Sequence, residues 1–269
     1  MFKTRLLSGI VLVLVALLTI CSGGTVLYMT VLCLSLIGAG ELFRVMKVRE
    51  DKWNLLEITG YAGVVIFYLS LLLLHDPMYQ MLALILDLVL LMAVYVFTYP
   101  KYNANQVMPA FFAIVYVGVM LSYVYQTRML DGGKFHVWLI FLCSWGCDTC
   151  AYCVGVLFGK HKMAPVLSPK KSVEGAVGGV VGAILLGIIY AAATKGGMVE
   201  YAIICGVGAL ISMVGDLAAS AIKRNQGIKD YGKLIPGHGG ILDRFDSVIF
   251  TAPIIYFLSV LLILSLIHI

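Results

Sequence analysis

Long apolar runs, separated by short polar or glycine-containing breaks, fill most of this sequence. A helix rises about 1.5 Å per residue, so roughly 20 apolar residues cross a bilayer. Runs close to that length recur from end to end, at 6–22, 25–43, 55–74, 79–98, 107–126, 135–157, 174–193, 201–221 and 247–267. The pattern predicts an all-α, polytopic integral membrane protein with about nine transmembrane helices.

The first apolar run has an alternative explanation as a secretory signal, because Lys3 and Arg5 precede it and Cys21 follows it. The run is long for a cleaved signal, however. Ile20, which stands before Cys21, is also larger than the residue that a lipoprotein cleavage site needs. We therefore expect this run to be a transmembrane helix.

The composition agrees with a membrane protein. Of the 269 residues, 61% are apolar and only 12% are charged, whereas soluble domains are about half apolar and about a quarter charged. This balance excludes a soluble cytosolic enzyme and a disordered chain. Cys147, Cys150 and Cys153 recur at every third position, and we interpret them as small packing residues of a helix rather than as metal ligands.

The basic residues predict the orientation of the chain. With the N-terminus inside, sixteen of the 19 Lys and Arg residues fall in inner segments, and Arg128, Lys134 and Lys195 fall outside. The positive-inside rule favours this arrangement and an odd number of spans. We expect an integral protein of the cell (inner or plasma) membrane, with its N-terminus and its active site facing the cytoplasm.

The polar residues divide the chain into two regions. Residues 1–130 contain about five spans and little else, whereas residues 131–269 contain two longer polar loops, at 158–173 and 222–246. Functional residues concentrate in loops that a rigid scaffold holds in place. We therefore predict an N-terminal transmembrane region and a C-terminal catalytic region with two cytoplasmic loops.

Acidic residues inside the apolar runs are informative, because each costs at least about 2.5–3.5 kcal/mol at the bilayer centre. Asp87, Asp148 and Asp216 are such residues, and Asp87 has no basic partner nearby in the sequence. Asp216 shares a helix face with Ser220 and Lys223, which follow it by four and seven residues. An internal ion pair with Lys223 is the purely structural explanation for Asp216.

Oxygen ligands and basic residues gather in the two loops. Asp243 and Asp246 are three residues apart and share a face if the segment is helical. Mg²⁺ binds through one or two carboxylates together with substrate phosphates, and Lys170 and Lys171 can neutralise such phosphates. Each group also has a purely structural explanation. Asp243 could stabilise the start of a helix through the helix dipole, and the loop around Lys170 could be basic only because it lies on the inner side of the membrane.

The residues of these loops form a long pattern. It comprises Ser220-Ala221-Ile222-Lys223-Arg224, Lys229-Asp230 and Pro236-Gly237-His238-Gly239-Gly240-Ile241-Leu242-Asp243-Arg244-Phe245-Asp246-Ser247, preceded by Asp148-Thr149, Ala151-Tyr152, Phe158-Gly159-Lys160, Ser168-Pro169-Lys170-Lys171-Ser172 and Glu174-Gly175. This pattern resembles the signature of the phosphatidate cytidylyltransferase family, also called CDP-diacylglycerol synthases. The resemblance covers residues 145–247, and residues 1–130 match only as hydrophobic spans.

The resemblance implies an enzyme of phospholipid biosynthesis that joins CTP and phosphatidic acid into CDP-diacylglycerol and releases pyrophosphate. It implies Mg²⁺, with room for a second cation such as K⁺. Asp216 and Asp243 are the implied metal ligands, and the candidate catalytic residues are Asp216, Asp243, Asp246 and Lys223. The candidate substrate-binding residues are Lys170, Lys171, Ser172, Ser220, Arg224, Lys229, His238, Gly239, Gly240 and Arg244.

Two alternatives remain at the level of sequence. One is another membrane enzyme that transfers nucleotidyl or phosphoryl groups to a lipid or polyprenol. The other is an ion-coupled transporter, suggested by the intramembrane acids, although the polar positions are concentrated in one half rather than repeated in both. The expected partners are CTP, phosphatidic acid and the lipid bilayer, and no nucleic acid is expected. The sequence leaves open whether the protein forms a homodimer.

Overall fold

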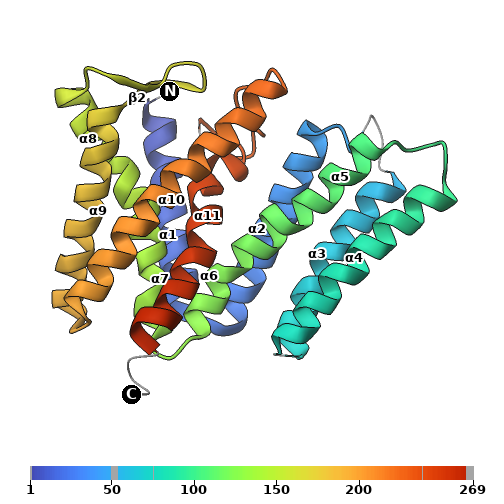
Figure 1. The fold of residues 1–269 in the computed structure, drawn as a ribbon, viewed down its shortest axis with the longest axis horizontal. Coiled ribbons are helices and arrows are strands. Elements are labelled where there is room, and N and C mark those ends of the chain that lie inside the picture. Colours follow the sequence, from blue (N-terminus) through green and yellow to red (C-terminus); the bar gives the residue numbers. More distant parts are fainter. Residues whose placement is uncertain (1, 50–53, 75, 238, 265–269) are drawn as a thin grey trace. The chain divides into compact units, whose positions relative to one another are not determined.

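The protein is built almost entirely of helices (Figure 1). The computed structural model describes residues 2–49, 54–74, 76–237 and 239–264, with side chains from residue 7 onward. The α-helices are α1 (Phe2–Ser22), α2 (Gly24–Val45), α3 (Leu55–Leu73), α4 (Pro77–Phe97), α5 (Ala104–Ala113), α6 (Met120–Met129), α7 (Gly133–Phe141), α8 (Cys147–Phe158), α9 (Val173–Thr194), α10 (Met198–Asn225) and α11 (Leu242–Ser259). The all-α prediction is confirmed.

Short π-helical segments join some of these helices into longer spans. Ile114–Val119 links α5 to α6, Leu142–Gly146 links α7 to α8, and Val260–Leu264 extends α11. Among the described residues, 8 helical segments are long and apolar enough to cross a membrane. The first expected span, 6–22, is helical and forms part of α1. Its apolar part, Leu7–Ser22, is shorter than these 8 segments and is not one of them. The polytopic membrane architecture is therefore confirmed.

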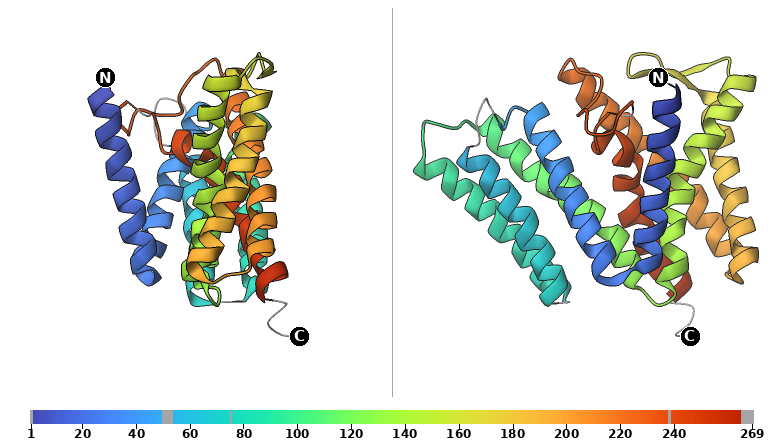
Figure 2. Two further views of the ribbon diagram at one scale, coloured as in Figure 1. Left: turned by 90° about the vertical axis from the view of Figure 1, so that its left-hand side faces the viewer. Right: turned by 180° about the vertical axis from the view of Figure 1, so that it is seen from behind.

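The loop at 158–173 contains a small β-hairpin. Strands β1 (Lys162–Ala164) and β2 (Ser168–Ser172) pair in antiparallel fashion, with Lys162 opposite Ser172. Ser172 then caps α9, because its hydroxyl accepts a hydrogen bond from the Gly175 N–H at 3.1 Å. Figure 2 shows the hairpin beyond one end of α8 and α9.

The elements cluster into two compact units. Unit 1 comprises Met1–Leu14, Thr25–Ser122 and Asp230–Arg244, and unit 2 comprises Val15–Gly24, Tyr123–Lys229 and Phe245–Ile269. In unit 1, α3 and α4 are close neighbours, and in unit 2, α9 packs against both α8 and α10 (Figure 1).

Small residues allow α9 to approach its neighbours. The buried face of α9 repeats at every fourth residue, as Gly175, Gly179, Ala183, Gly187 and Ala191, while Val177, Val181, Leu185 and Ile189 are exposed. A Cβ at Gly179 would lie 3.0 Å from Cys147 Sγ, and one at Gly187 would lie 2.6 Å from Cys205 Sγ. Backbones pack closely in this way when one helix presents only small side chains.

The three regularly spaced cysteines have different surroundings in this packing. Cys147 is buried against Gly179, and the Cys150 side chain occupies the space beside Gly182. Both therefore pack between helices, as predicted. Cys153 is exposed, so its side chain takes no part in the same interface.

A buried carboxylate holds the start of α11 in unit 1. Glu41, on α2, is only 4% exposed. Its two oxygens accept hydrogen bonds from the N–H groups of Ile241 and Leu242, at 3.0 and 2.9 Å. A Cβ at Gly232 or Gly240 would collide with this carboxylate, so the glycines leave the space that Glu41 occupies.

The position of Glu41 has a clear physical reason. The first N–H groups of a helix have no partner within the helix and must be satisfied from outside. A carboxylate at that end also interacts favourably with the helix dipole. Glu41 therefore fixes the C-terminal end of the polar segment 226–241 to the rigid helix α2.

Asp87, on α4, is a buried acid of unit 1 that the sequence singled out. It is 1% exposed, and neither of its oxygens has a hydrogen-bond partner within the described part of the chain. A Cβ at Gly63 of α3 would lie 3.1 Å from its carboxyl carbon. Asp87 therefore packs against the backbone of a neighbouring helix.

Replacing Glu41 tests its anchoring role. Glu41→Ala should lower the free energy of unfolding by about 2–4 kcal/mol, because two buried N–H groups lose a charged acceptor. Glu41→Gln keeps one acceptor oxygen and should fall between Ala and wild type. Hydrogen–deuterium exchange of the purified protein should accelerate in peptides covering 230–244 and stay unchanged in peptides from α9.

The exposed acid Asp131 provides the control for this experiment. Asp131→Ala removes a carboxylate without removing an acceptor of the 230–244 segment, so exchange there should match wild type. Unchanged exchange at 230–244 in Glu41→Ala would contradict the anchoring role.

Candidate active site

A pocket lined by both charged and apolar residues lies in unit 2, between the hairpin and three helices. Its volume is about 560 Å³, which falls in the range of small-molecule sites, roughly 300–1,000 Å³. α8 contributes Asp148 and α10 contributes Asp216, while Lys170 and Lys171 come from β2. The remaining lining residues are Ala151, Tyr152, Gly155, Val156, Lys162, Met163, Ser172, Gly175, Ala176 and Met213.

An ion pair crosses this pocket. Lys171 Nζ lies against Asp216 Oδ2, and each side chain is 26% exposed. The sequence had suggested Lys223, on the same helix, as the structural partner of Asp216. The observed pair instead joins two separate elements, β2 and α10. Lys171 belongs to the family pattern, and Asp216 is one of the metal ligands that the resemblance implies.

Further acids lie around Asp216. Asp246, on α11, is 9% exposed, and it interacts electrostatically with Asp216, Lys223 and Asp148. Lys223 is likewise buried, at 9% exposed. Carboxylates that approach one another in a poorly solvated site repel, so cations are needed to balance them. Lys171 and Lys223 provide part of that balance.

Asp148 was not among the residues to which the sequence assigned a role. The structure places it in the pocket wall, within electrostatic range of Asp246. The signal that could have identified it was present, because an acid within an apolar run is costly unless it serves a site. The sequence lacked the information that α8 and α10 bring Asp148 and Asp216 to one pocket.

The hairpin that carries the lysines is held at its base by Glu174. This side chain, in the first turn of α9, accepts hydrogen bonds from the backbone N–H of Lys160 at 3.1 Å and of His161 at 3.2 Å. His161 Nδ1 also lies 2.6 Å from Glu174 Oε1. Lys170 and Lys171 therefore belong to a hairpin whose two ends are both bound to the start of α9.

The floor of the pocket depends on glycines. A Cβ at Gly175 would lie 2.8 Å from the Ala151 carbonyl oxygen and 3.2 Å from Gly155 Cα. α8 and α9 can therefore approach backbone to backbone at this level. Any larger residue at Gly175 would separate the two helices that frame the pocket.

The glycine-rich part of the pattern, in unit 1, folds back on itself around Asp243. Asp243 Oδ2 accepts hydrogen bonds from the N–H groups of Tyr231 and Gly240, at 2.7 and 2.9 Å. Gly239 adopts a φ of +89°, and a Cβ there would lie 2.7 Å from the same oxygen. Asp243 thus organises this segment, as the capping alternative anticipated, and its role as a metal ligand stays a prediction.

The other predicted site residues have varied surroundings. Arg224 is exposed, and its Nη1 donates to the Ile228 carbonyl at 3.0 Å, which stabilises the turn after α10. Lys229 is exposed, and Ser220 and Arg244 are half-buried. His238 lies outside the described residues. The substrate-binding roles of Ser172, Ser220, Arg224, Lys229, Gly239, Gly240 and Arg244 stay predictions.

The donor set determines what kind of metal site is available. Among the described residues, no group of three His, Cys, Asp or Glu side chains could hold a metal ion. Mg²⁺ does not require such a group, because it keeps several waters and binds through one or two carboxylates plus substrate phosphates. The half-buried carboxylate of Asp216, beside the phosphate-compatible Lys170 and Lys171, fits that requirement.

Comparison with known proteins extends these observations to the whole chain. The model of the cytidylyltransferase family matches residues 3–262. The chain is 32% identical over 271 residues to a phosphatidate cytidylyltransferase of Staphylococcus saprophyticus, covering 97% of this chain and 99% of that protein. It is 33% identical over 270 residues to that of Staphylococcus aureus, covering 98% and 100%. It is 34% identical over 271 residues to that of Staphylococcus epidermidis, covering 97% and 99%.

These matches include the N-terminal spans, which the sequence pattern alone could compare only by their hydrophobicity. They also agree with the pocket of unit 2, where Lys171 of the pattern contacts Asp216. The chain belongs to the cytidylyltransferase family, is similar over nearly its full length to phosphatidate cytidylyltransferases, and is a nucleotidyltransferase.

Proposed function

We propose that this protein transfers CMP from CTP to phosphatidic acid, which gives CDP-diacylglycerol and pyrophosphate, in a Mg²⁺-dependent reaction. The observation that carries the proposal is the pocket of unit 2, in which Lys170, Lys171 and Asp216 meet among membrane-spanning helices. The names of the full-length relatives support the same substrates. A lipid substrate can reach such a pocket from the bilayer, and a nucleotide can reach it from water.

The chemistry requires two anions to approach each other. An oxygen of the phosphatidate phosphate bonds to the α-phosphorus of CTP, the bond from that phosphorus to the bridging oxygen breaks, and pyrophosphate leaves with the electron pair. Catalysis of this kind depends mainly on positioning and on charge neutralisation. Lys170 and Lys171 are the cations of the pocket that are suited to bind the phosphates.

The acids have a complementary role in this proposal. Mg²⁺, when bound, supplies charge neutralisation at the phosphates. Asp216 is the carboxylate that the pocket presents for it, and Asp243 is the second ligand that the sequence predicts. Asp246 and Lys223 are both buried. Asp246 interacts electrostatically with Lys223 and with Asp216, so these two residues contribute to the charge around Asp216.

The proposed orientation follows from the basic residues of the pocket. Lys162, Lys170 and Lys171 line it, and all three belong to the segments predicted on the inner side of the membrane. We therefore propose that the pocket opens toward the cytoplasm, where CTP is available.

The transporter alternative is no longer needed, because family membership makes the chain a nucleotidyltransferase. A transferase acting on another lipid or polyprenol remains the competing function, and the choice of acceptor distinguishes the two.

An assay with defined lipids tests the proposed reaction. Purified protein in vesicles that contain phosphatidic acid should release pyrophosphate from CTP and form CDP-diacylglycerol in equal amounts, and EDTA should stop both. Vesicles of phosphatidylcholine alone, or with dolichyl or undecaprenyl phosphate as the only acceptor, should give no product. Pyrophosphate release without phosphatidic acid, or none in its presence, would contradict the proposal.

Substitution of the ion pair tests the assignment of the pocket. Asp216→Asn should lower kcat by at least about 100-fold, because a metal-binding carboxylate acts at the transition state. Lys171→Gln should raise KM for CTP by about tenfold, the effect of losing one charge-assisted phosphate contact. Both are measured as CDP-diacylglycerol formation at varied CTP.

The double variant Lys171→Gln/Asp216→Asn decides between a catalytic and a structural pair. A pair that served only to balance buried charge would be replaced by two neutral partners, and activity would return toward wild type. The proposal predicts that the double variant stays as inactive as Asp216→Asn. Lys101→Gln, at an exposed lysine outside the pocket, should leave both parameters unchanged.

A further inference from the structure

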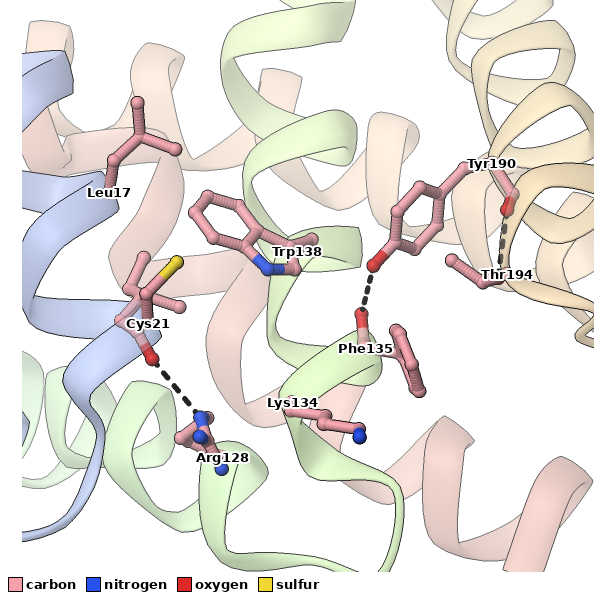
Figure 3. Close-up of a pocket in the computed structure, with 9 residues that line it drawn as sticks. Leu17, Cys21, Arg128, Lys134, Phe135, Trp138, Tyr190 and Thr194 are labelled. Carbon is pink, nitrogen blue, oxygen red and sulfur yellow. Dashed lines mark hydrogen bonds between the residues drawn. The ribbon is translucent and has the colours of Figure 1, made fainter.

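Unit 2 contains a second pocket, at the other ends of its helices. Figure 3 shows the residues that line it. Its volume is about 460 Å³. The lining residues come from the last turns of α1, α6 and α9 and from the first turns of α7: Leu17, Ile20, Cys21, Arg128, Lys134, Phe135, Trp138, Tyr190 and Thr194. None of these residues belongs to the family pattern or to the proposed reaction.

The second pocket lies one membrane thickness from the first. α9 has 22 residues and connects the two, since Gly175 near its start lines the first pocket and Thr194 at its end lines the second. At about 1.5 Å per residue this helix is about 33 Å long, close to the ~30 Å of a hydrocarbon core. The two pockets therefore lie at opposite membrane surfaces.

Two cations stand at this pocket without acidic partners. Arg128 and Lys134 lie on either side of the turn between α6 and α7, and the nine lining residues include no acid. Among the described residues, neither cation forms an ion pair. They are also two of the three basic residues that the sequence assigns to the outer side of the membrane.

Arg128 is held in place rather than extended into water. Its Nε donates to the Ile20 carbonyl oxygen at 3.1 Å, and a Cβ at Gly23 would lie 2.9 Å from its Nη2. This bond uses one of the five N–H donors of the guanidinium group. Lys134 lies over the Phe135 ring, with Nζ 4.9 Å from the ring centre.

The rest of the pocket is mainly apolar, and its lining changes from charged at one end to apolar toward the middle of the helices. In Figure 3, Arg128 and Lys134 lie at the end of the pocket nearest the α6–α7 turn, and Leu17 and Trp138 extend from it toward the middle of the helices. The Tyr190 hydroxyl donates to the Phe135 carbonyl at 3.0 Å. Trp and Tyr are typical of the membrane–water boundary, so the charged end lies at the level of the lipid head groups.

We propose that this second pocket binds an anionic phospholipid of the leaflet opposite the active site. Its phosphodiester lies between Arg128 and Lys134, and one acyl chain lies along Leu17 and Trp138. A phosphate group supplies the negative charge that the pocket lacks, and an acyl chain fills the apolar remainder. The bound lipid bridges α1, α7 and α9 and contributes to the stability of unit 2.

Native mass spectrometry of the full-length protein in detergent, with added dioleoyl phosphatidylglycerol or dioleoyl phosphatidylcholine, tests this proposal. Phosphatidylglycerol is a phosphodiester, which separates this site from that of the phosphomonoester substrate. Wild-type protein should retain phosphatidylglycerol at least about fivefold more strongly than phosphatidylcholine. Lys134→Gln should weaken the binding of phosphatidylglycerol about fivefold, because one cation near a lipid phosphate contributes about that much.

Control variants make the outcome specific. Lys195→Gln removes an exposed cation at the same ends of the helices but outside the pocket, and it should bind as wild type does. Arg128→Gln should weaken binding at least as much as Lys134→Gln. Arg128 also binds the backbone of α1, so Arg128→Gln could fail to fold. Lys134 is exposed and makes no such bond to a described residue, so Lys134→Glu provides a second test. Lys134→Glu should abolish the preference for phosphatidylglycerol.

Three results would overturn the proposal. These are equal retention of the two lipids by wild type, unchanged phosphatidylglycerol binding in Lys134→Glu, and an equal loss in Lys195→Gln. The Lys171→Gln variant should retain phosphatidylglycerol as wild type does, and a loss there would assign the lipid to the first pocket instead.

Discussion

An ionised side chain that is withdrawn from water is costly unless it has a partner, because lipid and apolar helices do not solvate it. Three acids of this fold show three solutions, whereas the carboxyl oxygens of Asp87 have no hydrogen-bond partner within the described part of the chain. Glu41 accepts two backbone N–H groups, Asp216 pairs with Lys171, and Asp246 is buried beside Lys223. Each solution ties together segments that are distant in sequence, so the need to neutralise charge also places the polar segments of the family pattern.

The sequence predicts the helical architecture well because that information is local. The length of an apolar run determines whether a helix crosses the bilayer, and eight such helical segments occur within the described ranges. The catalytic family was also accessible, because its pattern contains many specified residues and can be recognised directly in the sequence. Extending the likeness into the first spans required whole-chain relatives, since hydrophobic residues substitute for one another freely.

The contacts of the site could not be predicted in the same way. Helix geometry places Lys223 on the same face as Asp216, so it favoured that pair, whereas the partner found is Lys171 on a strand 45 residues earlier in the chain. The hairpin itself is short and carries Ser, Pro and Lys rather than alternating apolar residues, so nothing in its pattern indicated a strand. Glu41 was missed because its partners are backbone N–H groups, which a sequence does not display.

The two faces of α9 carry different evolutionary constraints. On one face, Val177, Val181, Leu185 and Ile189 are exposed, and an apolar side chain that contacts fluid lipid can be replaced by another of similar size. On the opposite face, Gly179 and Gly187 lie against the sulfur atoms of Cys147 and Cys205, where even one added methyl group has no space. Sequences can therefore drift quickly along one side of this helix and scarcely at all along the other.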